Sequence, residues 1–160
     1  MRLPSILVDT GVLYAFSDKK DELNLDAKAI MFSIVKGDFG SPIIVDYVIV
    51  ETLLLLKARG INEVARPLME FLRTNRFKVF FATQKIFDDS VELATKKGGE
   101  DDLSLTDSVE VTVSKNFESK TIATFDHTLS NFFQETIGEG FFERLPDREQ
   151  RALRKGQRNY

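Results

Sequence analysis

The chain of 160 residues has the length of one domain, and its 42% hydrophobic residues are enough to bury a core. It contains no cysteine, which excludes disulfides, thiolate nucleophiles and cysteine–zinc sites, and its one histidine, His127, cannot form a histidine pair or a multi-histidine metal site. The net charge of −3 is uneven, because residues 144–160 carry six Lys/Arg against two Asp/Glu and the rest of the chain therefore sums to −7.

Taken in chain order, apolar runs predict strands that alternate with helices. The β-branched run "SILVD" near the start is typical of a buried parallel strand. The predicted strands cover residues 5–9, 41–45, 77–82, 121–124 and 140–145. Helical spacing and end signals predict helices over residues 24–36, 46–60, 62–73, 84–97, 104–117 and 127–133. This alternation predicts one α/β domain, with a parallel sheet between layers of helices.

The segment 104–117 satisfies two local rules that conflict. Its valines alternate with Glu110 and Thr112, as the residues of a strand would. Its length favours a helix, and so does Ser104 followed three residues later by Asp107, which matches a helical capping box. We assign a helix. Asp107 is therefore explained as a capping residue unless other acids lie near it.

Four acids are predicted to lie at one edge of the sheet, where the strands have their carboxyl ends. Asp9 ends the first strand, Glu51 lies in the first two turns after the second, Asp107 begins the helix before the fourth, and Asp126 follows the fourth. Ligands of parallel sheets bind at this edge. Clustered carboxylates repel unless protons or a cation neutralise them, and Mg²⁺ or Mn²⁺ suits an all-oxygen site. We therefore predict that these acids are catalytic and hold one or two such ions, which could activate water against a phosphodiester.

Other polar residues near these acids have weaker cases. The hydroxyls of Thr10, Thr106 and Thr124 are predicted to orient the carboxylates by hydrogen bonding to them without binding the metal. His127 is interpreted as an exposed polar residue, with donation to a phosphate as the alternative. The acids at 100–102 are expected to be solvated loop residues.

Four segments, in this order, resemble the signatures of the PIN domain, and most closely those of VapC-type toxin ribonucleases. They are "ILVDTGVLYAF" at 6–16, "VETLL" at 50–54, "LSLTDS" at 103–108 and "IATFDHTLSNF" at 122–132. The resemblance implies a three-layer α/β/α sandwich around a mainly parallel five-stranded sheet with strand order 3-2-1-4-5. It also implies Mg²⁺- or Mn²⁺-dependent endonucleolytic cleavage of RNA by an acidic quartet, which here is Asp9, Glu51, Asp107 and Asp126.

The resemblance also implies partners: a second copy in a homodimer, and a cognate antitoxin whose basic side chain reaches into the acidic pocket. It extends to about residue 145, so we interpret 1–145 as the nuclease domain and 146–160 as a basic tail, either solvated or in contact with nucleic acid. No segment resembles a secretion signal or a membrane span, so we expect a cytoplasmic protein. Two alternatives stay open: an RNA-processing or quality-control nuclease without an antitoxin, and a non-catalytic RNA- or protein-binding module.

Overall fold

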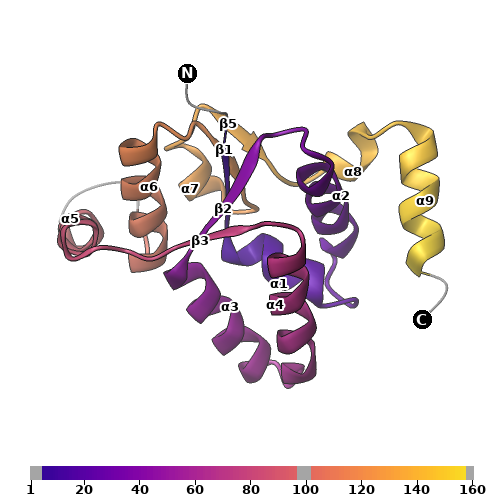
Figure 1. The fold of residues 1–160 in the computed structure, drawn as a ribbon, viewed down its shortest axis with the longest axis horizontal. Coiled ribbons are helices and arrows are strands. Elements are labelled where there is room, and N and C mark those ends of the chain that lie inside the picture. Colours follow the sequence, from indigo (N-terminus) through magenta and orange to yellow (C-terminus); the bar gives the residue numbers. More distant parts are fainter. Residues whose placement is uncertain (1–4, 97–101, 158–160) are drawn as a thin grey trace.

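The protein is built around a five-stranded parallel sheet with the order β3-β2-β1-β4-β5 (Figure 1), which confirms the expected topology. The computed structural model describes residues 5–96 and 102–157. The strands are β1 (Ser5–Val8), β2 (Ser41–Val45), β3 (Lys78–Phe80), β4 (Thr121–Ala123) and β5 (Glu135–Ile137).

Helices cover both faces of this sheet. They are α1 (Thr10–Ser17), α2 (Asn24–Lys36), α3 (Asp46–Ala58), α4 (Ala65–Thr74), α5 (Gln84–Thr95), α6 (Leu105–Phe117), α7 (His127–Ser130), α8 (Phe141–Arg144) and α9 (Asp147–Gln157), with a 3₁₀ turn at Asn62–Val64. In Figure 1, α5, α6 and α7 lie on one side of the sheet and α1, α2 and α4 on the other, which gives the three predicted layers. Within 5–96 and 102–157, no helix is both long and apolar enough to cross a bilayer.

The central strand β1 explains why the sequence begins with an apolar run. Ile6, Leu7 and Val8 are fully buried, because β1 pairs with β2 on one side and β4 on the other and is covered on both faces. Strand pairing stops where β1 ends, and the N–H of Asp9 donates to the carbonyl of Ala123 at 3.0 Å. The first acid of the predicted site therefore leaves the sheet beside the end of β4.

The predicted strand at 140–145 is wrong. The fifth strand is β5, at Glu135–Ile137, and residues 141–144 form the short helix α8. Gly140 precedes α8 in the left-handed conformation (φ 77°), and the carboxylate of Asp26 on α2 accepts hydrogen bonds from the N–H groups of Gly140 (2.9 Å) and Phe142 (2.8 Å). This cap comes from a residue more than a hundred positions away, so local sequence cannot reveal it. The bounds of the other predicted elements are correct to within three residues.

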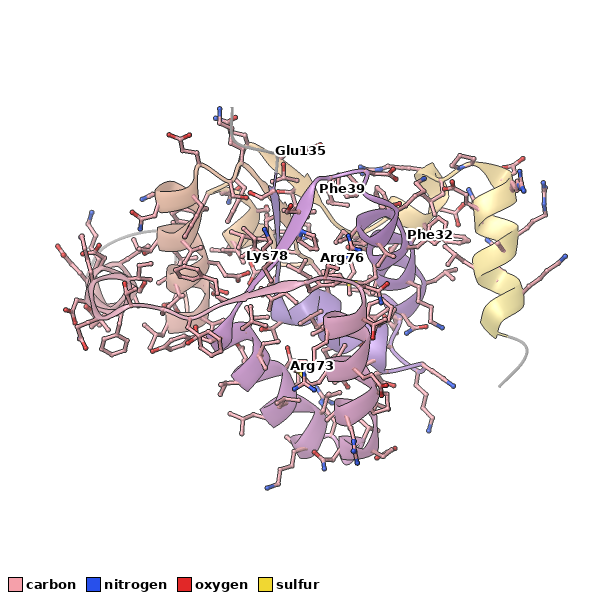
Figure 2. All side chains as sticks on the ribbon, in the orientation of Figure 1. Phe32, Phe39, Arg73, Arg76, Lys78 and Glu135 are labelled. Carbon is pink, nitrogen blue, oxygen red and sulfur yellow. The ribbon has the colours of Figure 1, made fainter. Side chains whose placement is uncertain are left out.

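The last helix, α9, lies beside α2. Lys36 on α2 forms an ion pair with Glu149 at 3.1 Å, and Leu153 packs against a small cluster that includes Phe142. Between α2, α4 and α9 lies a mostly apolar cavity of about 980 Å³, lined by Phe32 and Leu153 among others. Figure 2 shows Phe32 on the α9 side of α2.

Candidate metal centre

Asp9 is the most constrained acid of the candidate site. It is the N-cap of α1, where one carboxylate oxygen accepts the N–H of Thr10 at 2.6 Å and the other accepts the hydroxyl of Thr124 at 2.6 Å. Its exposed fraction is only 6%. Burial raises the pKa of Asp9 to about 6, and the charge of Asp107 adds to the rise while the hydrogen bonds from Thr124 and Thr10 oppose it. Two hydrogen bonds thus fix a carboxylate that burial makes costly to ionise.

Asp107 forms the predicted capping box at the start of α6. Its Oδ2 accepts the N–H of Ser104 at 2.9 Å, and its own N–H donates to the hydroxyl oxygen of Ser104 at 3.1 Å. The cap does not exclude a role in the site, because this half-buried side chain also offers a carboxylate oxygen to the group described next. The capping box therefore holds an acid that faces Asp9.

Glu110 joins Asp9 and Asp107, although the sequence did not predict it as a site residue. One carboxylate oxygen from each of the three acids lies within 4.8 Å of the other two. Glu110 is fully buried, and burial, followed by the charges of Asp9 and Asp107, raises its pKa well above the ordinary value. A signal was present in the sequence: residues three apart share one face of a helix, so a helical 104–117 places Glu110 beside Asp107.

The other two predicted acids, Glu51 and Asp126, lie outside this three-acid group in the described parts of the chain. Glu51 is exposed on α3 and its Oε2 accepts the hydroxyl of Thr10 at 3.3 Å. Asp126 is exposed and caps α7, with Oδ1 accepting the N–H groups of Thr128 (2.7 Å) and Leu129 (3.0 Å). Glu51 is therefore connected to the three-acid group through Thr10, which also donates to Asp9.

Two of the three predicted threonines connect these acids. Thr10 donates its hydroxyl to Glu51, while its N–H donates to Asp9. Thr124 donates to Asp9 and accepts the backbone N–H of Asp126 at 2.9 Å. Thr106 is half-buried in the first turn of α6, and its hydroxyl makes no hydrogen bond to an acid of the described segments.

The remaining polar candidates lie at the surface or beyond the described residues. His127 is exposed at the start of α7, as expected. Asp102 is exposed as expected, whereas residues 100 and 101 lie outside the described residues.

The donor set of the three-acid group suits a hard divalent cation. All the ligand atoms are carboxylate oxygens, the kind that Mg²⁺ and Mn²⁺ prefer. Each salt bridge found within 5–96 and 102–157 involves other acids, so no Lys or Arg there neutralises this group. A bound cation would supply the missing positive charge.

Comparisons with known proteins agree with this fold. No family model matches the sequence. A curated protein called VapC ribonuclease, from Archaeoglobus fulgidus, is 25% identical over 147 residues, which are 92% of this chain and 91% of that protein. The crystal structure of VapC20 from Mycobacterium tuberculosis, described as a sarcin–ricin loop cleaving toxin, has a TM-score of 0.68 at 20% identity, covering 79% of this chain and 93% of VapC20. This chain is therefore similar in sequence to a VapC ribonuclease over nearly its whole length, and it has the PIN-like fold of VapC20.

Two further structures share this PIN-domain architecture. PAE2754 from Pyrobaculum aerophilum has a TM-score of 0.58 at 19% identity, covering 95% of this chain and 98% of PAE2754. A toxin–antitoxin complex from Klebsiella pneumoniae contains a chain with a TM-score of 0.50 at 19% identity, covering 76% of this chain and 86% of that one. These identities are low, so the structural matches show a common fold rather than a common substrate.

The metal-free protein should lose stability as pH rises. In the folded state the pKa of Asp9 is about 6, above its ordinary value of 3.8. Proton binding by Asp9 therefore favours the folded state, and this contribution is complete below the ordinary value and lost as pH rises through about 6. The difference corresponds to a fall of about 3 kcal/mol in the free energy of unfolding. Urea unfolding in EDTA at a series of pH values measures it.

The matched control for this titration is Asp9→Asn, which cannot ionise at this position. Subtracting the free energy of unfolding of D9N from that of the wild type removes the contribution of the titrating groups that do not interact with Asp9. We expect the difference to fall by about 2–3 kcal/mol between about pH 4 and about pH 7.5. A difference that stays constant over this range would contradict the raised pKa.

Proposed function

We propose that this protein is a metal-dependent endoribonuclease that hydrolyses RNA phosphodiester bonds, and that it is the toxin of a VapBC-type pair. The observation that carries the proposal is the group formed by Asp9, Asp107 and Glu110, whose carboxylates meet at the carboxyl edge of the sheet without a cationic partner in the described segments. The relative called VapC ribonuclease, which aligns with 92% of the chain, supports it.

In this proposal Asp9, Glu51, Asp107 and Asp126 hold one or two Mg²⁺ or Mn²⁺ ions. A bound ion supplies Lewis-acid stabilisation of the charge that develops on the phosphate. The residues of the chain position the acids around it. Thr124 fixes Asp9 through its 2.6 Å hydrogen bond, and the capping box fixes Asp107. Glu51 and Asp126 have exposed side chains, and in this proposal they turn toward the ion when it binds.

The decisive experiment incubates the purified protein with structured and unstructured RNA in Mn²⁺ and in EDTA. We expect internal cleavage products in Mn²⁺ and none in EDTA, read on denaturing gels. Equal cleavage in EDTA would overturn the metal-dependent mechanism. RNA binding without cleavage in Mn²⁺ would instead favour the non-catalytic binding module.

The antitoxin partner is the part of the proposal that distinguishes a toxin from a processing nuclease. One of the structural neighbours is a chain of a toxin–antitoxin complex, which supports a protein inhibitor for this chain as well. A small open reading frame upstream whose product relieves growth arrest would establish the pair. An RNA substrate and such an inhibitor would also place the protein in the cytoplasm, as expected.

The proposed homodimer would use exposed apolar side chains of α3, α5, α6 and the segment between β3 and α5. Five large hydrophobic side chains are exposed there: Val50, Leu54, Phe81, Phe87 and Phe117. The exposed fractions of Leu54 (63%) and Phe81 (72%) are high for apolar side chains of this size. Exposed apolar side chains of this size suit a protein interface where they gather in one patch.

The division of the chain into a nuclease domain, 1–145, and a basic tail, 146–160, also remains a proposal. Within the tail, α9 presents exposed Arg148, Arg151 and Lys155, while Arg154 lies over the ring of Phe142. These charges would suit contact with an RNA backbone, and such contact would weaken as salt concentration rises.

A further inference from the structure

Glu110 has an environment that neither the capping box nor the packing of α6 explains. Its side chain is fully buried, and both carboxylate oxygens lack a hydrogen-bond donor in the structure. The residues on either side of it, Val109 and Val111, are also fully buried. An alanine would serve the helix better, because a buried polar group without a partner costs free energy of folding.

The carboxylate of Glu110 points toward other acids. One of its oxygens lies within 4.8 Å of oxygens from both Asp9 and Asp107, so its nearest charged neighbours repel it when ionised. The hydroxyl-bearing residues packed near this part of α6 are committed elsewhere: Thr112 donates to the carbonyl of Ser108 at 2.8 Å, and Ser108 donates to the carbonyl of Ser104 at 2.8 Å. The protein therefore surrounds Glu110 with acids, and only a carboxyl proton shared with Asp9 could give it a hydrogen bond.

A divalent cation between the three acids would resolve this arrangement. It would turn three repelling carboxylates into ligands and give the orphaned oxygens of Glu110 a partner in the buried end of the site. We propose that Glu110 is a direct ligand of the bound divalent cation, adding a buried fifth acid to the four predicted from the sequence. This inference rests on the proposed function, because it assigns a ligand to the same metal site.

The test is Mn²⁺ binding, measured by isothermal titration calorimetry on the full chain, without RNA and independently of cleavage. Glu110→Gln keeps the size of the side chain and removes its charge. We expect the Kd for Mn²⁺ to rise at least about tenfold, since even residues that only orient metal ligands cost about 10–100-fold in affinity when mutated. We also expect Mn²⁺ to raise the Tm of E110Q less than that of the wild type.

Two further variants make the outcomes distinct. Glu92→Gln removes a charge from an exposed position on α5 and should leave the Kd unchanged. Asp107→Asn removes a predicted ligand and should raise it. If D107N loses affinity while E110Q binds as the wild type does, Glu110 is no ligand but the proposed metal site stands. If the wild type binds no Mn²⁺, both proposals fail.

A second substitution covers the case in which E110Q does not fold. Glu110→Asp keeps the charge but shortens the side chain by one methylene, so the carboxylate is withdrawn from the centre of the group. We expect E110D to bind Mn²⁺ more weakly than the wild type. An E110D protein with the affinity of the wild type would overturn the inference.

Discussion

Asp107→Asn is expected to reduce the rate of RNA cleavage in saturating Mn²⁺ by about 10³-fold. Removing one group that stabilises charge in a transition state typically lowers the rate by about this factor. The substitution removes a negative ligand from the group formed with Asp9 and Glu110. It keeps an oxygen that can accept the N–H of Ser104, so the start of α6 should stay capped. Single-turnover cleavage of a labelled RNA measures the rate.

Asp102→Asn is the matched control for this substitution. Asp102 is an exposed acid five residues before Asp107, so D102N makes the same change of net charge near the site without touching the three-acid group. Cleavage by D102N should equal that of the wild type. If D107N is folded and cleaves at the wild-type rate, Asp107 is a capping residue only, and the catalytic assignment fails.

Leu54→Asp is expected to convert the proposed homodimer to a monomer, with the dimer Kd raised by about 10²-fold or more, because burying an unpaired carboxylate in an interface costs several kcal/mol. Leu54 is 63% exposed on α3, so the substitution should leave the fold of the monomer intact. Analytical ultracentrifugation over a range of protein concentrations measures the Kd.

The control for the interface is Val35→Asp. Val35 is 44% exposed on α2 and lines the cavity beside α9 together with Phe32, whereas no residue of α3 lines this cavity. V35D should therefore dimerise as the wild type does. A wild-type protein that sediments as a monomer at tens of micromolar, or a dimer that survives L54D, would exclude this surface as the interface.

Much of the fold was predictable because each of the strands β1 to β4 has its own apolar signature. β2 begins and ends where it was predicted, at Ser41 and Val45, and its last three residues are all β-branched. The conflict at 104–117 was resolved correctly by helix length and by the capping box. The alternation of valines with polar residues does not mark a strand here. The whole stretch from Ser108 to Ser114 is buried in a helix, and its hydroxyl groups donate to backbone carbonyls.

The failures of the sequence reading have long-range causes. Residues 140–145 carry two adjacent phenylalanines, which suggested a strand, but the helix they form depends on Asp26 from α2. The patterns considered also did not single out α1, an eight-residue helix whose N-cap, Asp9, was interpreted as a site residue. Short elements such as these derive their stability from tertiary contacts rather than from local periodicity.

The sequence predicted where the site lies better than it predicted which residues form it. The rule that ligands bind at the carboxyl edge of a parallel sheet placed Asp9 and Asp107 together, as the structure has them. Glu110 was not predicted as a site residue, although the helix assigned to 104–117 places it on the same face as Asp107. Glu51 and Asp126 lie at exposed positions, and the direction of an exposed side chain does not follow from sequence spacing.

The hydrogen bond from Thr124 to Asp9 spans 115 positions of the chain. Synthesis proceeds from the N-terminus at about 5–20 residues per second, so the central strand waits for several seconds on the ribosome before its neighbour β4 emerges. Until then Asp9 has neither its hydroxyl partner nor the acids of α6 beside it. An interrupted translation product that ends before residue 107 would lack Asp107, Glu110 and Thr124, so the three-acid group can form only once nearly the whole polypeptide has been made.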